Sequence, residues 1–115
     1  TVEEMTLLQS RFPDNIRLFL AMEDQIPLAG ALIYDTGQVI RIQYGHASQR
    51  GKELGALDLV YDHLIRFFSG NRNYLDFGQC TEQNGQFLNA GLIHQKESFG
   101  GRGTLYDIYQ IDLLK

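Results

Sequence analysis

The hydrophobic pattern changes its period near residue 45, and this change limits the fold more than any other feature of the chain. Three earlier segments, residues 16–22, 28–34 and 39–44, alternate in polarity or are almost wholly apolar, which is typical of β-strands. Residues 54–68 then repeat apolar side chains at helical spacing, and residues 74–77 show a fourth strand pattern. Because a strand–helix–strand crossover of this length makes its flanking strands parallel, we expect an α/β domain with mixed α+β layers around a mixed sheet.

Turn signals indicate how the first strands are connected. Polar residues at 23–25 and 35–37 are typical of hairpin turns, so the first three strands should form an antiparallel meander. Residues 2–10 should form the last turns of a helix, which Pro13 and its neighbours then end.

The pattern also predicts which strand faces are buried. Residues 28–34 are nearly all apolar, so we expect this strand to be buried on both faces. Ile40, Ile42 and Tyr44 follow a period of two and should share one face. Residues 45–51 carry no strand pattern and should form a loop before the crossover helix.

The last third of the chain should add another helix and another strand. A polar loop at residues 79–85 should lead into an apolar-periodic helix, which a double glycine ends. The apolar stripe of this helix comprises Leu88, Leu92, Ile93 and Phe99. The aromatic-rich residues 105–114 should form the last strand. Polar groups would then gather at the end of the fourth strand, where open α/β sheets tend to bind ligands.

Composition excludes several classes of protein. The 115 residues are 43% hydrophobic and 21% charged, as expected for one globular domain spanning residues 1–115. A net charge of −4 argues against a DNA-binding protein, and no apolar run is long enough to span a membrane. The single Cys80 cannot form an internal disulfide, which favours a reducing, cytoplasmic compartment. Since the chain begins at Thr1, we expect that it is part of a longer one; the oligomeric state is left open.

One motif lies in the last third of the chain. Its residues are Asp76-Phe77-Gly78, Thr81-Glu82, Gly85, Leu88-Asn89, Gly91-Leu92, Gln95-Lys96-Glu97 and Phe99-Gly100. This motif, together with an element order that covers nearly the whole chain, resembles the GNAT superfamily of N-acyltransferases, and in particular its FemAB-like branch. The resemblance implies a GNAT-like sheet in which the third and fourth strands splay apart, with a first strand and a first helix preceding Thr1.

In ordinary members of this family the acyl donor is acetyl-coenzyme A (acetyl-CoA), which lies in the splay between these strands. Its pyrophosphate would bind backbone N–H groups at the start of the crossover helix, where the helix dipole favours anions. The residues that the resemblance assigns to this donor site are Gln49, Arg50, Gly51, Lys52, Gly55 and Ala56. The glycines permit close approach of the backbone, and the two basic side chains could pair with phosphate oxygens.

The donor loop departs from the family pattern, Gln/Arg-x-x-Gly-x-Gly/Ala. With Gly55 matched to the first glycine, Lys52 stands where glutamine or arginine belongs, and Leu57 stands where a small residue belongs. FemAB-like relatives take their acyl group from aminoacyl-tRNA, so an aminoacyl-tRNA donor is the alternative to acetyl-CoA. An ordinary glycine-containing connection would explain the segment as well.

Acylation of an amine needs a base for the amine proton, donors that polarise the carbonyl, and an acid for the leaving group. Glu82 follows the fourth strand and His46 follows the third, so parallel neighbouring strands would bring both side chains to one edge as catalytic bases. The resemblance implies a carbonyl contact with a backbone N–H within residues 44–47. Both side chains are also typical of solvated loops.

Other polar residues carry weaker predictions. Asp76 could act as a base, but within a short strand a carboxylate more often accepts backbone hydrogen bonds or pairs with a cation. Cys80 has no adjacent histidine and is typical of packing. Three histidines without a spaced cysteine or carboxylate cluster predict no metal site. Family members often carry a tyrosine as the acid on the helix after the fourth strand, and residues 85–99 contain no tyrosine.

Two functions fit these observations. The first is an N-acyltransferase that transfers an acetyl or aminoacyl group to the primary amine of a small molecule or a peptide by direct attack. The second is a GNAT-like module without catalytic activity that provides a binding or dimerisation surface. The polar loop at residues 79–85 favours the enzyme, whereas the irregular donor loop and the missing tyrosine favour the module.

Overall fold

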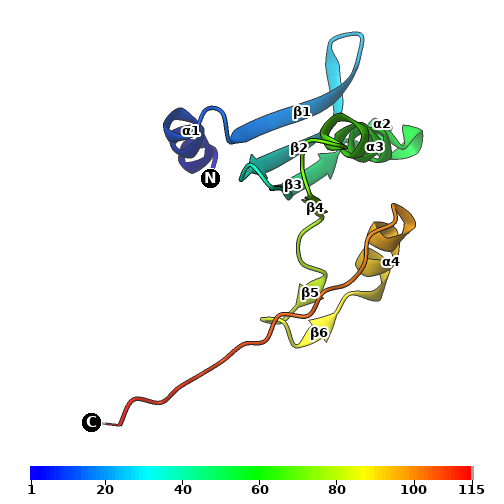
Figure 1. Cartoon of the computed structure of the whole chain (residues 1–115). Coiled ribbons are helices and arrows are strands. Elements are labelled where there is room, and N and C mark those ends of the chain that lie inside the picture. Colours follow the sequence, from blue (N-terminus) through cyan, green and yellow to red (C-terminus); the bar gives the residue numbers. More distant parts are fainter. Residues whose placement is uncertain (115) are drawn as a thin grey trace. The chain divides into compact units, whose positions relative to one another are not determined.

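The computed structural model describes residues 1–114, and the chain divides into two compact units, Thr1–Gln79 and the residues from Cys80 onward (Figure 1). The first unit contains α1 (Val2–Arg11), β1 (Ile16–Glu23), β2 (Ile26–Asp35), β3 (Val39–Ala47), α2 (Gln49–Leu54), α3 (Ala56–Phe68) and β4 (Tyr74–Asp76). The second contains β5 (Thr81–Glu82), β6 (Phe87–Leu88) and α4 (Ala90–Ser98). Within the described residues, no helix combines the length and the apolar character needed to cross a bilayer.

The first unit is built on a four-stranded mixed sheet with the strand order β1-β2-β3-β4. β1, β2 and β3 pair antiparallel, whereas β4 pairs parallel to β3. Asp24 and Gln25 connect β1 to β2 with φ angles of 47° and 66°, and two positive angles are typical of a tight hairpin turn. The predicted meander, the crossover helix and the mixed sheet are therefore confirmed.

The parallel pair of β3 and β4 is short. In the described residues it extends from Val39, opposite Tyr74, to Arg41, opposite Asp76, whereas β3 itself continues to Ala47. Gly78 turns the chain after β4 with a φ of 78°. The described parallel ladder therefore ends well before β3 does.

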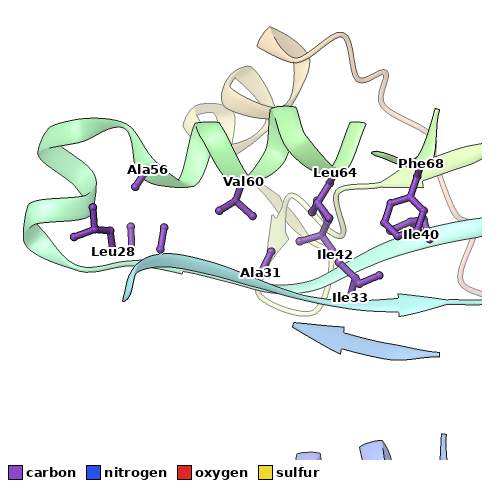
Figure 2. Close-up of a cluster of buried hydrophobic side chains, with 11 residues drawn as sticks. Leu28, Ala31, Ile33, Ile40, Ile42, Ala56, Val60, Leu64 and Phe68 are labelled. Atoms are coloured by element: carbon purple, nitrogen blue, oxygen red, sulfur yellow. The ribbon is translucent and has the colours of Figure 1, made fainter. Parts of the chain in front are cut away.

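One face of the sheet is covered by α3, and the core lies between them (Figure 2). The helix points Ala56, Val60, Leu64 and Phe68 at the sheet, which meets them with Ala31, Ile33, Ile40 and Ile42. This spacing of every fourth residue is what the sequence pattern predicted, because one stripe of a helix faces one layer. The predicted helical segment begins later than expected, since residues 49–54 form a separate short helix and Gly55 separates the two.

A β-bulge in β3 reverses one predicted face. Leu32 lies opposite Tyr44 but Ile33 lies opposite Ile42, so Gln43 is an extra residue in the ladder. The extra residue shifts the alternation, and Tyr44 points away from α3 with 58% of its surface exposed. The prediction that Tyr44 shares a face with the core isoleucines is therefore wrong.

The face opposite α3 is only partly covered. Its exposed apolar side chains on β1 are Leu18, Leu20 and Met22. Leu32 and Tyr34 on β2 are half-buried, so the prediction that this strand is buried on both faces is wrong. Near the end of β2, α1 contributes Met5, whose sulfur accepts a hydrogen bond from the Tyr34 hydroxyl at 3.7 Å.

The second unit departs most from the sequence predictions. The predicted polar loop, residues 79–85, contains β5, and the predicted helix contains β6; the two strands pair antiparallel around Gln83, Asn84 and Gly85, which have positive φ angles. The predicted helix begins only at Ala90, because Asn89 caps it with a side chain that accepts the Leu92 N–H. Residues 105–114 form no strand in the described chain and expose almost all of their apolar side chains. That prediction is wrong: a strand needs a paired partner, which local sequence does not supply.

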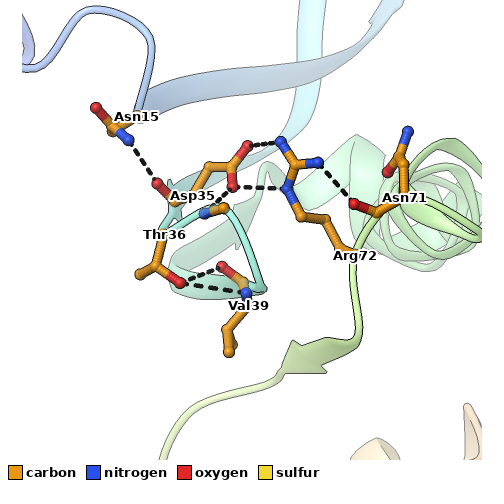
Figure 3. A network of polar contacts seen from close by, with 7 residues as sticks. Asn15, Asp35, Thr36, Val39, Asn71 and Arg72 are labelled. Carbon is orange, nitrogen blue, oxygen red and sulfur yellow. Dashed lines mark hydrogen bonds and ion pairs between the residues drawn. The ribbon is translucent and has the colours of Figure 1, made fainter.

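A partly buried ion pair connects the end of β2 to the segment after α3 (Figure 3). Asp35 is 6% exposed, and Arg72 donates from Nε and Nη2 to its two carboxylate oxygens at 2.8 and 2.7 Å. The Gly37 N–H donates to the same carboxylate, while Asn15 exchanges hydrogen bonds with the Asp35 backbone. The hydrogen bonds from Arg72 hold the pKa of Asp35 below its usual value.

We expect Asp35→Asn to lower the free energy of unfolding at pH 7 by about 1.5–3 kcal/mol, because two charge-assisted hydrogen bonds weaken together. The folded pKa of Asp35 lies below the unfolded value of about 3.9, so the stabilisation is complete above that value and is lost as pH falls through the folded pKa. Urea denaturation should therefore show that the difference in free energy of unfolding between the wild type and Asp35→Asn becomes smaller below about pH 4.

Asp62→Asn is the matched control for this experiment. Asp62 pairs with Arg66 at 2.8 Å, but both side chains are largely exposed, so its loss should change stability little. A gap between the wild type and Asp35→Asn that stays constant from pH 7 to pH 3 would show that the Asp35 charge is not its source.

Candidate functional site

An open groove of about 350 Å³ lies on the sheet face opposite α3. Its walls are mainly aliphatic and include Leu18, Leu20 and Leu32, and its polar side chains are Tyr44, His46 and Ser48. The bulge in β3 explains why an imidazole and a phenol occur together here: it places Tyr44 opposite Leu32 and His46 opposite Gly30, on the same face. This pairing could not be predicted from the sequence, because a bulge cannot be recognised from periodicity alone.

His46 lies inside β3, near its end, and its side chain is exposed in the groove. The prediction of a loop at residues 45–51 is wrong, because the ladder with β2 continues to Ala47. Of two consecutive strand residues, one directs its N–H toward β2 and the other toward the open side left by β4. The end of β3 therefore presents an exposed imidazole beyond the last described pair of the β3–β4 ladder.

On the other face of β3, Tyr61 from α3 reaches the same point of the strand. Gly45 faces α3, and a Cβ atom at Gly45 would lie 2.4 Å from the Tyr61 hydroxyl. The Tyr61 ring packs edge-to-face on Phe77, just after β4, with ring centres 5.7 Å apart. Burial, and then the charge of Asp58, raise the pKa of Tyr61 above its usual value. In the sequence, this tyrosine is only one of the side chains that repeat at helical spacing over residues 54–68.

The predicted acetyl-CoA site comprises residues 49–52, 55 and 56, here called the donor segment, and its first half forms the first turn of α2. Ser48 caps this helix by accepting the Gly51 N–H at 3.0 Å, and its own backbone N–H donates to the Leu28 carbonyl at 2.8 Å. Gly51 is buried against β2, where a Cβ would lie 2.0 Å from the Leu28 oxygen. Gly51 thus has a packing role, while its part in a phosphate site stays a prediction.

The second half of the segment starts α3. Gly55 adopts a left-handed conformation with a φ of 68° and caps α2, but it supplies no side-chain acceptor to the start of α3 at Ala56. The first N–H groups of α3 therefore suit an anion. Asp58 in the same turn adds a negative charge that opposes one.

The polar side chains of the donor segment are mostly engaged with carboxylates. Arg50 lies 3.5 Å from Glu23, and Gln49 donates to Glu53 at 3.4 Å. Lys52 is exposed in the last turn of α2. Arg50 and Lys52 are both surface side chains. Because a surface ion pair contributes little free energy, either side chain can leave its present contacts and bind a phosphate at a small energetic cost.

The two predicted bases lie in different units. Glu82 is an exposed residue of β5, and it accepts a hydrogen bond from the Asn89 side chain at 2.8 Å. His46 belongs to the first unit, so the structure describes each base separately and does not test their predicted convergence. Asp76 pairs with Arg41 at 2.7 Å and accepts the Gly78 N–H, which confirms the structural explanation for this carboxylate.

Comparisons with known proteins find solved structures that share the fold of this chain at low sequence identity. No protein-family model and no curated sequence matches the chain. Among solved structures, a possible acetyltransferase from Clostridium difficile 630 has a TM-score of 0.71 at 10% identity, over 96% of this chain and 75% of that one.

Two aminoglycoside N-acetyltransferases are also similar in structure. AAC(6')-Iy, in complex with CoA, has a TM-score of 0.63 at 13% identity, over 97% of this chain and 92% of that one. The apo enzyme AAC(6')-IG from Acinetobacter haemolyticus has a TM-score of 0.54 at 15% identity, over 97% and 83%. At such identities the likeness establishes the fold and leaves the activity to be argued from the site. The chain therefore has the mixed α/β fold of these solved acetyltransferases.

Proposed function

We propose that this protein is an N-acetyltransferase that uses acetyl-CoA to acetylate a primary amine. The observation that carries the proposal is the end of β3, where the exposed His46 imidazole lies in an open groove, beyond the last described pair of the β3–β4 ladder. An imidazole is suited to act as a general base. A backbone N–H on the outer edge of β3 is suited to hold a carbonyl oxygen.

Residues at the start of α3 and at the end of β3 would have different roles in the reaction. Acetyl-CoA supplies the activated acyl group. The start of α3, at Gly55 and Ala56, would hold its phosphates, with Arg50 and Lys52 as basic side chains at the surface of the preceding helix. His46 would accept the proton that the amine loses as it attacks. The N–H groups at the end of β3 would orient the carbonyl and stabilise charge on its oxygen.

We place acetyl-CoA before aminoacyl-tRNA as the donor. The solved structures that share the fold are acetyltransferases, and one of them is a complex with CoA. The net charge of −4 is unfavourable for a large polyanion such as tRNA. The FemAB-like assignment therefore ranks second.

The acceptor would be a primary amine, either a small molecule or a peptide side chain. Two structural neighbours are aminoglycoside acetyltransferases, so aminoglycosides belong in the first panel of acceptors. The groove beside His46 is mainly aliphatic, which favours an amine on an apolar body. The free thiol of Cys80 agrees with a reducing compartment, and we place the reaction in the cytoplasm.

A GNAT-like module without activity is the second candidate, and two charges favour it. Arg50 is already paired with Glu23, and Asp58 places a carboxylate in the first turn of α3. Both features weaken the attraction for a phosphate. A binding experiment that changes one of these charges distinguishes the two candidates.

We expect Asp58→Asn to tighten the binding of acetyl-CoA about fivefold, because removing one charge about 4 Å from a phosphate is worth roughly 1 kcal/mol in water. Isothermal titration calorimetry of the wild type and the variant measures this change. Asp62→Asn is the control: it removes an equal charge one helical turn further on, where Arg66 already balances it, and should leave the affinity unchanged.

Failure of both the wild type and Asp58→Asn to bind acetyl-CoA would eliminate this donor and leave the inactive module or an aminoacyl-tRNA donor. Binding with equal affinity in all three chains would place the phosphates away from the start of α3.

A further inference from the structure

Gly30 lies in the groove between Leu20 and His46. The register of the sheet places the three residues in one row, because Leu20 of β1 is opposite Gly30 of β2, and Gly30 is opposite His46 of β3. Paired residues of antiparallel strands share a face, so the whole row belongs to the face opposite α3. The neighbouring row on this face comprises Leu18, Leu32 and Tyr44. Gly30 is therefore the one position in these two rows that has no side chain.

The missing side chain leaves a narrow slot beside the imidazole. A Cβ atom at Gly30 would lie 2.7 Å from Cδ2 of Leu20 and 3.8 Å from Cδ1 of Leu18, so both leucine side chains lean over the glycine. The Phe19 carbonyl oxygen would be 3.3 Å from the same atom. The space next to His46 is thus bounded by leucine methyl groups and by the backbone of Gly30.

The charges around the groove suit an acceptor with a single amine. Among the described residues that line the groove, none is acidic. Glu23, at the end of β1, lies 3.5 Å from Arg50. A polyamine or an aminoglycoside would bring further ammonium groups against aliphatic side chains without a counter-charge, which is unfavourable. The groove volume of about 350 Å³ is also near the lower end of the range for small-molecule sites.

We propose that Gly30 determines the acceptor specificity, and that the acceptor is a primary monoamine whose unbranched carbon chain lies in the slot between Leu20 and His46. The inference rests on the proposed function, because it names the acceptor class of the same site. The nitrogen at one end of the chain lies beside the His46 imidazole, and the carbon chain contacts the leucine side chains. An acceptor of this kind differs from the aminoglycosides that two structural neighbours are named for.

The first test measures kcat/KM of the wild type for ethylamine, butylamine, hexylamine, spermidine and kanamycin at saturating acetyl-CoA. Alkylamines of different length are almost equally basic, so differences among them report contacts of the carbon chain. We expect kcat/KM to rise about twofold to fourfold per methylene from ethylamine to hexylamine, because each methylene leaves water. Hexylamine should exceed spermidine and kanamycin, whose additional charges find no partner in the groove.

The second test fills the slot. Gly30→Ala should lower kcat/KM for hexylamine about tenfold, because the new methyl group displaces the end of Leu20 into the space that the carbon chain occupies. The loss for ethylamine should be much smaller, since its short chain occupies little of that space. General damage to the fold or to His46 would instead lower both rates equally.

The third test supplies the missing counter-charge. Leu20→Glu should raise kcat/KM for spermidine about fivefold and lower it for hexylamine, because a carboxylate then faces the additional ammonium groups. Met22→Glu is the matched control: Met22 is equally exposed on the same face of β1, at 50% against 49% for Leu20, but it does not line the groove. A gain of rate in Leu20→Glu alone cannot result from misfolding.

The outcomes separate the inference from the proposed function. Equal kcat/KM for ethylamine and hexylamine, or a wild type that prefers spermidine or kanamycin, would overturn the inference alone. Equal losses for both alkylamines in Gly30→Ala, or equal responses of spermidine to Leu20→Glu and Met22→Glu, would also overturn it. A wild type that transfers no acetyl group to any of the five amines would overturn the proposed function, and the inference with it.

Discussion

His46→Ala should lower kcat for acetyl transfer by about 100-fold or more while leaving the KM for acetyl-CoA nearly unchanged. The reason is the position of the imidazole at the end of β3, in the groove and away from the start of α3 where the donor's phosphates are expected. A side chain that takes a proton only as the amine attacks contributes to the transition state and not to binding. The measurement is steady-state release of free thiol at saturating acetyl-CoA.

Controls separate a base from a structural residue. His94→Ala removes an exposed imidazole from α4 in the second unit and should leave the rate unchanged. Added imidazole should restore part of the lost rate in His46→Ala, which it would not do if the side chain only supported the fold. Glu82→Gln tests the other predicted base. Full activity in both His46→Ala and Glu82→Gln would remove both residues from the mechanism.

The order of elements in the first unit was predictable because each element follows a simple period. Strands at 16–22, 28–34 and 39–44 and the helix at 54–68 appear close to their expected places. The parallel pairing of β3 and β4 followed from the crossover helix between them. These features depend on the burial of one stripe of a helix or one face of a strand, and the local hydrophobic pattern predicts that burial.

The composition of the site was not predictable to the same degree. His46 could be named because it is a titratable residue near a strand end, but its neighbour Tyr44 reaches the groove only through the bulge at Gln43. Tyr61 looks like one more apolar residue of α3, and its contact with Gly45 depends on how closely helix and strand approach. The bulge at Gln43 and the close contact at Gly45 are features of the tertiary structure. The hydrophobic period of the sequence does not predict them.

The C-terminal strand failed as a prediction for a related reason. Residues 105–114 have the composition of a strand, but composition describes only the tendency of a segment and not the presence of a partner. The start of α4 shows the opposite case. Asn89 moves the helix start to Ala90 through a single side-chain cap, a local signal that the apolar stripe had obscured.

Gly51→Ala should lower the free energy of unfolding by about 3 kcal/mol, near the upper end of the cost of inserting a methyl group into a packed interior. The new Cβ would lie 2.0 Å from the Leu28 carbonyl oxygen and 2.8 Å from its carbon. Both are backbone atoms, and the oxygen already accepts the Ser48 N–H, so neither can move without breaking the junction of β3 and α2. For a unit of this size the melting temperature should fall by roughly 12 °C or more.

Gly91→Ala is the matched control, since Gly91 is also helical but has room for a Cβ, with its nearest neighbour at 3.6 Å. Alanine exceeds glycine in helix propensity by about 1 kcal/mol, so this variant should be neutral or slightly stabilised. A loss of stability in Gly51→Ala but not in Gly91→Ala would show that the loss comes from the contact of the new Cβ with β2, and not from replacing a helical glycine by alanine. A melting temperature unchanged by Gly51→Ala would mean that α2 lies farther from β2, and the glycine would then be free to serve the donor's phosphates instead.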